Sequence, residues 1–473
     1  MNKYIAYSIL LASAALSSCS SSFLDQDPPL YIEPNDIYNS PERVESALLG
    51  LYSSIKNTGS ESFLGGKTYM VFDNRSEDIV NVDENLITLA NTYSFNVGPT
   101  DTENTTTWNN AYATINKANI FLSNLEEAKE VVADKYEQYK AEALFLRALT
   151  YFYLNNLYSM PYVIDPAAKS VPLRLKAETS QANNALKRST VTEVYEQILE
   201  DLNEMGSLPV KSGLNEENVT RATQAAANML KMRVYMAMEN WTEAINAGSQ
   251  ITGYELSSNV SDMFTAPYYT DETIFSLPMS DTNSPNSQQG LGEYYNSSSY
   301  LLLVDMENGI FTKTGYDIDA DLRHSLLNKE EKDGTTRVRL MKFTDAARGL
   351  DWVPVFRYAE TLLNLAECYA NEGASKNEAM AREYLKEVRR RSLSESNDTF
   401  LSDSQIDALS GEDLLQAIYN ERRIEFIGEG MRGIDVLRRG ASFERKVAVT
   451  PQHKGYIWPI AQSEQLMNPD LNK

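Results

Sequence analysis

The stretch 221–251 constrains the fold more than any other part of the chain, because two apolar stripes with helical spacing follow each other across a short break. Members of the first stripe recur at steps of three and four residues, which places them on one face of a helix: Ala222, Ala226, Met229, Leu230, Val234 and Ala237. The break falls at Glu239 and Asn240, and a second stripe runs from Trp241 to Ile251. Alanines at facing positions let two helix backbones come close. The stretch therefore predicts a helix hairpin that must pack on other elements to bury its apolar side.

Two further segments indicate related units. Residues 357–369 carry an apolar stripe that is followed, after a break, by another over 378–391. Residues 140–158 are apolar nearly all round, which predicts a helix buried at the centre. Such hairpins are typical of tetratricopeptide (TPR) proteins, but their spacing here is far from the roughly 34 residues of a tandem array. We therefore expect a mainly α-helical fold, in which TPR-like helix hairpins form a right-handed helical scaffold, an α-α superhelix with long irregular insertions.

The region 257–351 differs from the helical segments around it. It is rich in Ser, Asn, Gly and Tyr, with strand-like pieces at 273–277 and 337–343. A structureless loop of this length is rare in a compact body, so we expect a functional insertion with its own structure. Further helices are predicted at 35–57, 106–125, 189–205 and 410–440. The predicted body, 35–473, thus has TPR-like helices at about 35–256 and 353–440 around a ligand-binding insertion at about 257–351.

The first residues predict an exported lipoprotein. Residues 1–18 have the features of a signal peptide, with Lys3 before an apolar stretch, Tyr4–Leu16, that is shorter than the ~20 residues needed to span a bilayer. Small residues before Cys19 resemble the bacterial lipobox, in which the cysteine is acylated and becomes the new N-terminus. Buried acyl chains contribute about 0.8 kcal/mol per CH₂, so several would anchor the chain firmly. Residues 19–34 are predicted to form a lipidated tether.

Charge and composition exclude several classes of function. The net charge of −23 repels phosphate, so a nucleic-acid partner is not expected. The only histidines, His324 and His453, leave little material for a His-based metal site or a catalytic triad, and no cofactor or metal is predicted. Asp317, Asp319 and Asp321 alternate as in a calcium loop but lack the required Gly and terminal Glu. Two carboxylates could cleave glycosides, but no signature selects a pair, so no catalytic residue is predicted.

Five segments in order, beginning behind Cys19, resemble the SusD/RagB family of nutrient-binding lipoproteins on the outer surface of Bacteroidetes. They are Ser22–Asp25, the helix and proline exit at 140–163, RYAETLLNLAE at 357–367, NERRIEFIGEGMRGIDVLRRG at 420–440 and YIWPIAQSEQLMN at 456–468. The resemblance implies a lipid-anchored protein exposed on the outer membrane. It also implies a SusC-like TonB-dependent barrel as partner, over whose mouth the lipoprotein sits. Members of this family have no catalytic activity and capture glycans or, in the RagB branch, oligopeptides.

A glycan site requires several flat aromatic faces together with planar polar groups. One sugar on one tyrosine ring buries about 50 Å², which contributes only about 1 kcal/mol. Helix faces are committed to packing, so we expect ligand-binding residues in the loops. The candidates are Tyr294, Tyr295, Tyr300, Tyr268, Tyr269, Asp73, Asn74, Arg75, Tyr93 and Asn96. Core positions are predicted for Trp108, Trp241, Trp352 and Trp458, and a structural network or barrel contacts for Arg422, Arg423, Glu425, Glu429 and Arg432.

The leading hypothesis is a non-enzymatic surface lipoprotein that binds nutrient oligosaccharides and delivers them to the barrel. An oligopeptide-binding lipoprotein of the RagB type is a second hypothesis, and it would have a deep cleft with groups that pair with a peptide backbone. A third is a TPR-type adaptor that binds only protein, and a fourth is a glycosidase.

Overall fold

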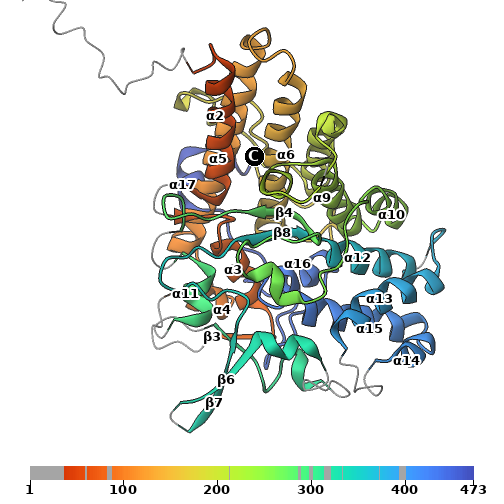
Figure 1. Ribbon diagram of the computed structural model, residues 1–473. Coiled ribbons are helices and arrows are strands. Elements are labelled where there is room, and N and C mark those ends of the chain that lie inside the picture. Colours follow the sequence, from red (N-terminus) through yellow and green to blue (C-terminus); the bar gives the residue numbers. More distant parts are fainter. Residues whose placement is uncertain are drawn as a thin grey trace, which may run out of the picture.

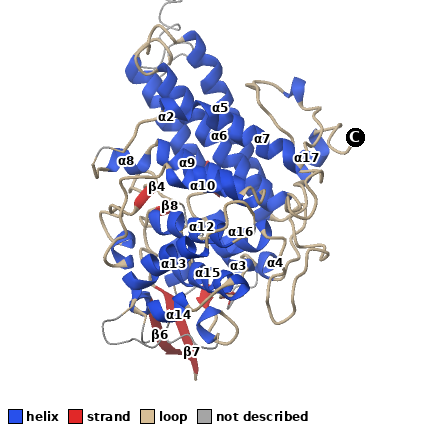
Figure 2. Ribbon diagram, turned by 90° about the vertical axis from the view of Figure 1, so that its right-hand side faces the viewer, coloured by secondary structure: helices blue, strands red, loops and turns tan. Residues whose placement is uncertain are grey.

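The structure, a computed structural model, describes residues 37–58, 61–81, 88–211, 213–285, 289–297, 302–313, 321–332, 334–371, 373–393 and 401–473. Helices make up most of it and the strands are short (Figures 1 and 2), which confirms the prediction of a mainly α-helical fold. The helices are α2 (Pro41–Lys56), α3 (Lys67–Arg75), α4 (Ala90–Tyr93), α5 (Thr102–Glu127), α6 (Tyr136–Tyr158), α7 (Val191–Asp201), α8 (Glu216–Thr220), α9 (Gln224–Ala237), α10 (Trp241–Ser249), α11 (Leu291–Asn296), α12 (Tyr358–Ala370), α13 (Glu378–Ser392), α14 (Asp403–Asp407), α15 (Gly411–Glu425), α16 (Met431–Arg438) and α17 (Gln462–Met467). The strands pair antiparallel as β1 (Asn57–Thr58) with β2 (Glu61–Ser62), β3 (Ile79–Asn81) with β5 (Leu302–Val304), β4 (Thr273–Leu277) with β8 (Val353–Arg357), and β6 (Leu327–Lys332) with β7 (Thr335–Leu340).

Helices α9 and α10 form the predicted hairpin. The Thr223 side chain caps α9 and the Asn240 side chain caps α10, each by accepting a hydrogen bond from the backbone N–H three residues on, at 3.2 and 3.3 Å. The two helices lie so close that a Cβ atom at Gly248 would be 2.8 Å from the Cε of Met232. Apolar side chains of this hairpin share a buried cluster with Leu365 of α12, so the unit packs on a second hairpin, α12–α13.

Helix α6 lies at the centre of the upper part of the molecule, beside α2 and α5 (Figure 1). Every residue from Ala141 to Tyr158 is buried, as its apolar pattern predicts. The Trp108 ring of α5 meets Tyr158 edge-on, with centroids 4.8 Å apart, which confirms a core position for this tryptophan. The buried guanidinium of Arg147 is neutralised by Asp201 of α7 at 2.6 Å.

The prediction of one continuous helix over 410–440 is wrong, because the chain turns between α15 and α16. Gly428 and Gly430 in this turn have φ angles of 83° and 72°, which glycine adopts at little cost. A Cβ atom at Gly428 would lie 2.1 Å from Leu340, so contact with the insertion also requires glycine there. The turn directs the Gly430 N–H to the Asp73 carboxylate, which accepts it at 3.0 Å.

The region 257–351 is tied to distant parts of the chain by its strands. β5 pairs with β3, which directly follows α3, and β4 pairs with β8, which leads into α12. The hairpin β6–β7 extends from the lower end of the molecule in Figures 1 and 2. These pairings bring residues near 80, 303 and 336 to one side of the protein, where a cavity lies.

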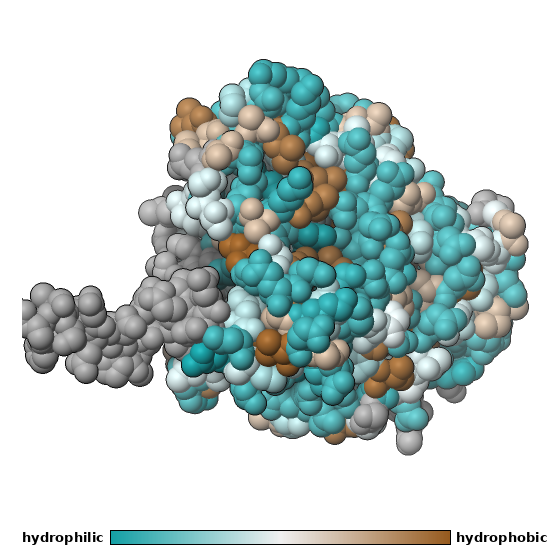
Figure 3. Space-filling view, turned by 90° about the horizontal axis from the view of Figure 1, so that it is seen from above, coloured by the Kyte–Doolittle hydropathy of each residue, from teal (hydrophilic) through white to brown (hydrophobic). Residues whose placement is uncertain are grey.

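The surface seen from above is largely hydrophilic, with small scattered hydrophobic areas (Figure 3). Within the described residues, no helix combines the length and the apolar character needed to cross a membrane. The predicted signal peptide 1–18, Cys19 and the tether 19–34 lie outside those residues.

Candidate ligand-binding cavity

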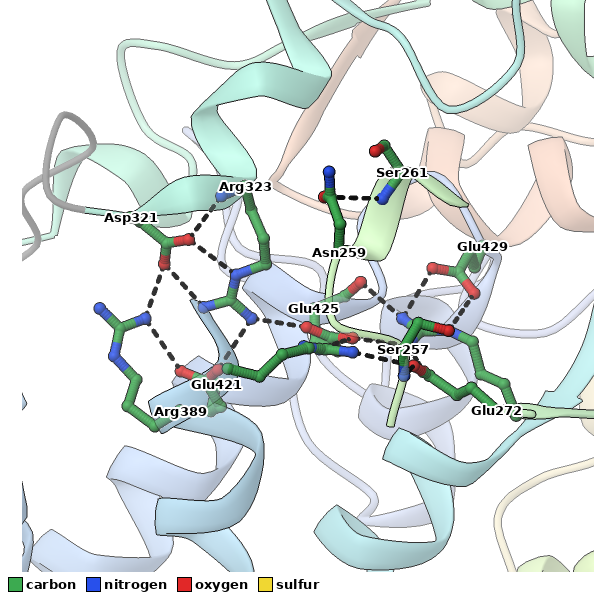
Figure 4. Close-up of polar contacts among 12 residues, drawn as sticks. Ser257, Asn259, Ser261, Glu272, Asp321, Arg323, Arg389, Glu421, Glu425 and Glu429 are labelled. Carbon is green, nitrogen blue, oxygen red and sulfur yellow. Dashed lines mark hydrogen bonds and ion pairs between the residues drawn. The ribbon is translucent and has the colours of Figure 1, made fainter. Parts of the chain in front are cut away.

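A buried network of five cations and five carboxylates joins the region 257–351 to β8 and the C-terminal helices, and Figure 4 shows most of its members. Its members are Arg323, Lys342, Arg357, Arg389 and Arg391, with Glu272, Asp321, Glu421, Glu425 and Glu429. The Arg357 guanidinium lies 2.8 Å from Glu272 and 2.8 Å from Glu429, and it also pairs with Glu425. Charges so deeply buried remain stable only when each meets its counterpart.

The cations of the network keep Glu425 and Asp321 ionised despite their burial. Burial raises the pKa of Glu425, but Arg391, Arg357 and Arg323 outweigh it and bring that pKa well below its usual range. Burial likewise opposes ionisation of Asp321, whose pKa is lowered to about 2 by Arg323 and Arg389. Of the three alternating aspartates that were considered for calcium, Asp321 forms ion pairs with arginines instead. Asp317 and Asp319 lie outside the described residues.

The other charges of the C-terminal helices are matched in the same way. Arg422 pairs with Asp435 at 2.8 Å, Arg423 with Asp78 at 2.6 Å, and Arg432 with Glu77. This finding confirms the structural interpretation of the dense charges at 422–432. Because these side chains are committed to one another, a ligand site has to be sought elsewhere.

A cavity of about 760 Å³ lies where β3, β5, β7, the end of α4 and the segment 445–453 meet. Its polar and aromatic lining comprises Ser76, Glu77, Tyr93, Ser94, Phe95, Asp305, Glu307, Asn308, Thr335, Thr336, Arg337, Arg445, Lys446 and His453. A volume of this size suits a small oligomeric ligand. The mixture of ring, hydroxyl, amide and charged groups can bind both the C–H face and the hydroxyls of a sugar.

Tyr93 and Arg445 form one wall of the cavity. The Arg445 guanidinium carbon lies 3.6 Å from the Tyr93 ring centroid, in a cation–π contact. Its Nη1 donates to the backbone carbonyls of Asn74 and Tyr93, at 3.0 and 3.1 Å. Burial lowers the pKa of Arg445 from its usual value. Both side chains are half-buried, so their contacts with protein fix them while part of each faces the cavity.

Asp73, Asn74 and Arg75 were predicted to contact ligand, but their side chains are buried and bind protein instead. Arg75 lies between the rings of Phe95 and Phe443, about 5 Å from each, and donates to the Tyr456 carbonyl. These contacts hold the segment that carries Arg445 against the end of α4. The three residues therefore support the cavity without lining it.

Tyr294 and Tyr295 were predicted as ligand-binding residues of a loop, but the structure buries both in a helix. They are 2% and 0% exposed, because α11 packs this side against α3. The Tyr294 hydroxyl accepts from Lys67 at 3.1 Å, and the Tyr295 hydroxyl donates to Asp73 at 2.8 Å. Tyr300 lies outside the described residues.

Tyr268 and Tyr269 surround Trp352 in a second, half-buried aromatic group. Their ring centroids lie 6.0 and 5.8 Å from that of Trp352. The side chains of Trp352 and Trp241 are only half-buried, although both were predicted to lie in the core. Trp458 is buried, as predicted. Asn96 is exposed and does not line the cavity. A binding role for Tyr268 and Tyr269 stays a prediction.

Most of the cavity lining was not found from the sequence. Asp305, Asn308 and Arg337 reach Tyr93 only through the pairing of β3 with β5 and the approach of β7, which no local pattern encodes. Of the lining residues, only Tyr93 was among the predicted candidates.

Comparison with known proteins agrees with this architecture. A family model described as "Starch-binding associating with outer membrane" matches residues 22–236, and one described as "SusD family" matches residues 324–473. A crystal structure of a SusD superfamily protein from Bacteroides fragilis is 52% identical, with a TM-score of 0.87, and the match covers 93% of this chain and 100% of that one. The chain belongs to the SusD family.

Two other proteins show how far the likeness extends. The SusD-like protein P25 of Formosa agariphila is 26% identical over 483 residues, covering 89% of this chain and 88% of that protein. Surface glycan-binding protein A of Bacteroides thetaiotaomicron, solved in complex with laminarihexaose, is 18% identical with a TM-score of 0.69, over 91% of this chain and 98% of that one. This last likeness shows that the SusD fold is shared.

Proposed function

We propose that this SusD-family chain is a non-enzymatic, lipid-anchored surface protein that binds oligosaccharides in the 760 Å³ cavity and delivers them to a SusC-like TonB-dependent barrel. The observation that carries the proposal is the wall of that cavity, where the Tyr93 ring is held under Arg445 among hydroxyl and amide groups. The family description "Starch-binding associating with outer membrane" and the laminarihexaose complex of a protein with the same fold support a glycan as ligand.

The expected affinity follows from the groups available. One sugar face on Tyr93 contributes about 1 kcal/mol. Hydrogen bonds from Arg445, Asn308 and Thr336 add about 1 kcal/mol each, since each replaces a bond to water. A total of about −4 kcal/mol corresponds to millimolar binding, which suits a protein that must release its ligand to a transporter.

The carboxylates of the cavity favour binding over hydrolysis. Glu77 is paired with Arg432 and lies 3.3 Å from Arg423, and Asp305 accepts from the backbone N–H groups of Glu307 and Asn308 at 2.7 and 2.8 Å. Burial opposes ionisation of Glu77, but Arg432 and Arg423 outweigh it and lower the pKa of this carboxyl, whereas the Asp305 oxygens are occupied by backbone N–H groups. A glycosidase needs one carboxyl group that is protonated at working pH, which these contacts oppose.

Glycan binding is tested by affinity electrophoresis of the mature protein in gels that contain starch, laminarin, xylan or pectin. We expect at least one polysaccharide to retard the wild type, and the Tyr93→Ala variant to run faster in that gel. Retardation by none of them, with a peptide library giving binders, would replace this proposal by oligopeptide binding. Binding of neither class would favour the protein adaptor.

The anchor and the partner require separate tests. Growth with labelled palmitate should label the wild type and leave a Cys19→Ala variant unlabelled. Purification from detergent-solubilised outer membrane should recover a large barrel protein together with this chain. Recovery of the chain alone would contradict delivery to a barrel.

A further inference from the structure

We infer that the cavity recognises an acidic saccharide, one that carries a carboxylate or a sulfate ester, through Arg445 with Lys446 and Arg337. This inference rests on the proposed glycan function and specifies the class of glycan. Its basis is a difference in charge compensation between the carboxylates that line the cavity and the Arg445 guanidinium.

The lining carboxylates are committed to the protein or to solvent. Glu77 is balanced by two arginines, Arg423 and Arg432. Asp305 accepts two backbone N–H groups and the Asn308 side-chain amide. Glu307 is exposed, so its charge is screened by water and salt.

Arg445 is in the opposite situation. Among the described residues, no carboxylate oxygen lies within ion-pair distance of its guanidinium, and both of its hydrogen bonds to backbone carbonyls are donated by Nη1. Glu77 and Asp305 act on the guanidinium only electrostatically, from beyond ion-pair distance. The Tyr93 ring and the two carbonyls that accept from Nη1 restrict the movement of the guanidinium. Its Nη2 and Nε donors remain for a ligand, in the planar geometry that matches a carboxylate or a sulfate.

Two more cations lie beside it. Lys446 follows directly, is exposed and lines the same cavity, and Arg337 lines it from β7. The same lining carries the carboxylates Glu77, Asp305 and Glu307, so what distinguishes the three cations is that Arg445 has no ion-pair partner within the described part of the chain and Lys446 is exposed. The net negative charge of the protein repels polyanions. Binding of an acidic glycan would therefore have to come from these cations and would indicate specific recognition.

The test uses polymers of one backbone with and without charge. Polygalacturonic acid is compared with its methyl ester, and dextran sulfate with dextran, so the two pairs separate carboxylate from sulfate recognition. By affinity electrophoresis, we expect at least one acidic polymer to bind about tenfold more tightly than its neutral counterpart, since a charge-assisted hydrogen bond of this kind is worth that ratio or more. We also expect 0.5 M NaCl to reduce the preference, because cations partly open to solvent are screened.

Single substitutions test which residues cause the preference for acidic over neutral polymers. Arg445→Gln should abolish it, and Lys446→Gln, at an exposed position where folding is not at risk, should reduce it severalfold. Arg348→Gln is the matched control, because this arginine is exposed, pairs with Asp345 and does not line the cavity. Its preference should equal that of the wild type.

Equal binding of acidic and neutral polymers overturns the inference and leaves the glycan function standing. A preference that survives in both Arg445→Gln and Lys446→Gln also overturns it, because other residues would then carry recognition. Failure to bind these polymers and every polysaccharide named above, with folding verified by circular dichroism, removes the glycan function itself.

Discussion

The buried network around Arg357 and the cavity wall around Arg445 use the same side chain in opposite ways. Arg357 is 1% exposed and meets three glutamates, whereas Arg445 is half-buried and meets a ring and two carbonyls. In the network, charge is compensated within the protein, and the arginine fastens the insertion to the helical scaffold. In the cavity wall, the protein fixes the position of the Arg445 guanidinium, but no described residue provides an ion-pair partner, so a bound ligand could supply the opposite charge.

This difference separates stability from binding. Removing one partner of a buried ion pair leaves an uncompensated charge and is costly, whereas removing a half-buried cation that has no ion-pair partner leaves no such charge and costs less. Substitutions in the network should therefore change the free energy of unfolding without changing ligand affinity. Substitutions in the cavity wall should lower ligand affinity and change the free energy of unfolding much less.

The largest effect is expected from Arg357→Met. The substitution leaves Glu272, Glu425 and Glu429 without their central cation, and we expect the free energy of unfolding to fall by about 3–5 kcal/mol in urea denaturation. Arg348→Met is the control, since its side chain is 64% exposed and should cost less than about 1 kcal/mol. Equal losses in the two variants would show that the network contributes no more than a surface pair.

A second effect concerns Asp73, which lies beside the network and has a carboxyl pKa raised by burial to about 7. The hydrogen bonds from Tyr295 and Gly430 only partly oppose that increase. Because the ordinary value is 3.8, the folded protein holds more protons than the unfolded chain between about pH 4 and pH 7. The contribution of Asp73 is therefore fully present at low pH and is lost as the pH rises through 7.

The variant Asp73→Asn isolates this contribution, because an amide cannot ionise. The unfolding free energy of the wild type minus that of Asp73→Asn should fall by about 2–4 kcal/mol from pH 4 to pH 8. Urea denaturation at several pH values measures the difference. A difference that stays constant with pH would place the Asp73 pKa near its usual value and contradict the effect of burial.

The same contrast explains what could be predicted from the sequence. The hairpin α9–α10 was predicted because its apolar residues recur with the period of a helix, and α6 was predicted because its segment is apolar nearly all round. Each segment carries this signal by itself. The break between α15 and α16 was missed, because Gly428 is required by contact with Leu340, far away in the chain.

The cavity shows most clearly which residues could not be predicted from the sequence. Tyr93 was a candidate because an aromatic residue in a polar segment is a local signal. Arg445 was not, since its position depends on carbonyls 371 and 352 residues earlier in the chain. Tyr294 and Tyr295 gave a false signal, because the composition of their surroundings indicated a loop, while α11 turns both rings inward.

The smallest effect is expected from Tyr295→Phe, and its size should depend on pH. The change removes the hydroxyl that donates to Asp73 at 2.8 Å and keeps the buried ring, so it tests a single hydrogen bond. At pH 8 the bond is made to a charged carboxylate, and its loss should cost about 1.5–2 kcal/mol in urea denaturation, whereas at pH 5, with Asp73 largely protonated, the cost should be below about 1 kcal/mol.

Glycan retardation of Tyr295→Phe should equal that of the wild type, because Tyr295 is buried and does not line the cavity. Tyr294→Phe, whose lost hydroxyl accepts from Lys67, is the matched control and should show no such change in cost between pH 5 and pH 8. If Tyr295→Phe weakened glycan binding while leaving stability unchanged, the ring pair of α11 would belong to the ligand site after all. Helix α11 would then have to be assigned to the ligand-binding part of the protein and not to its buried interior.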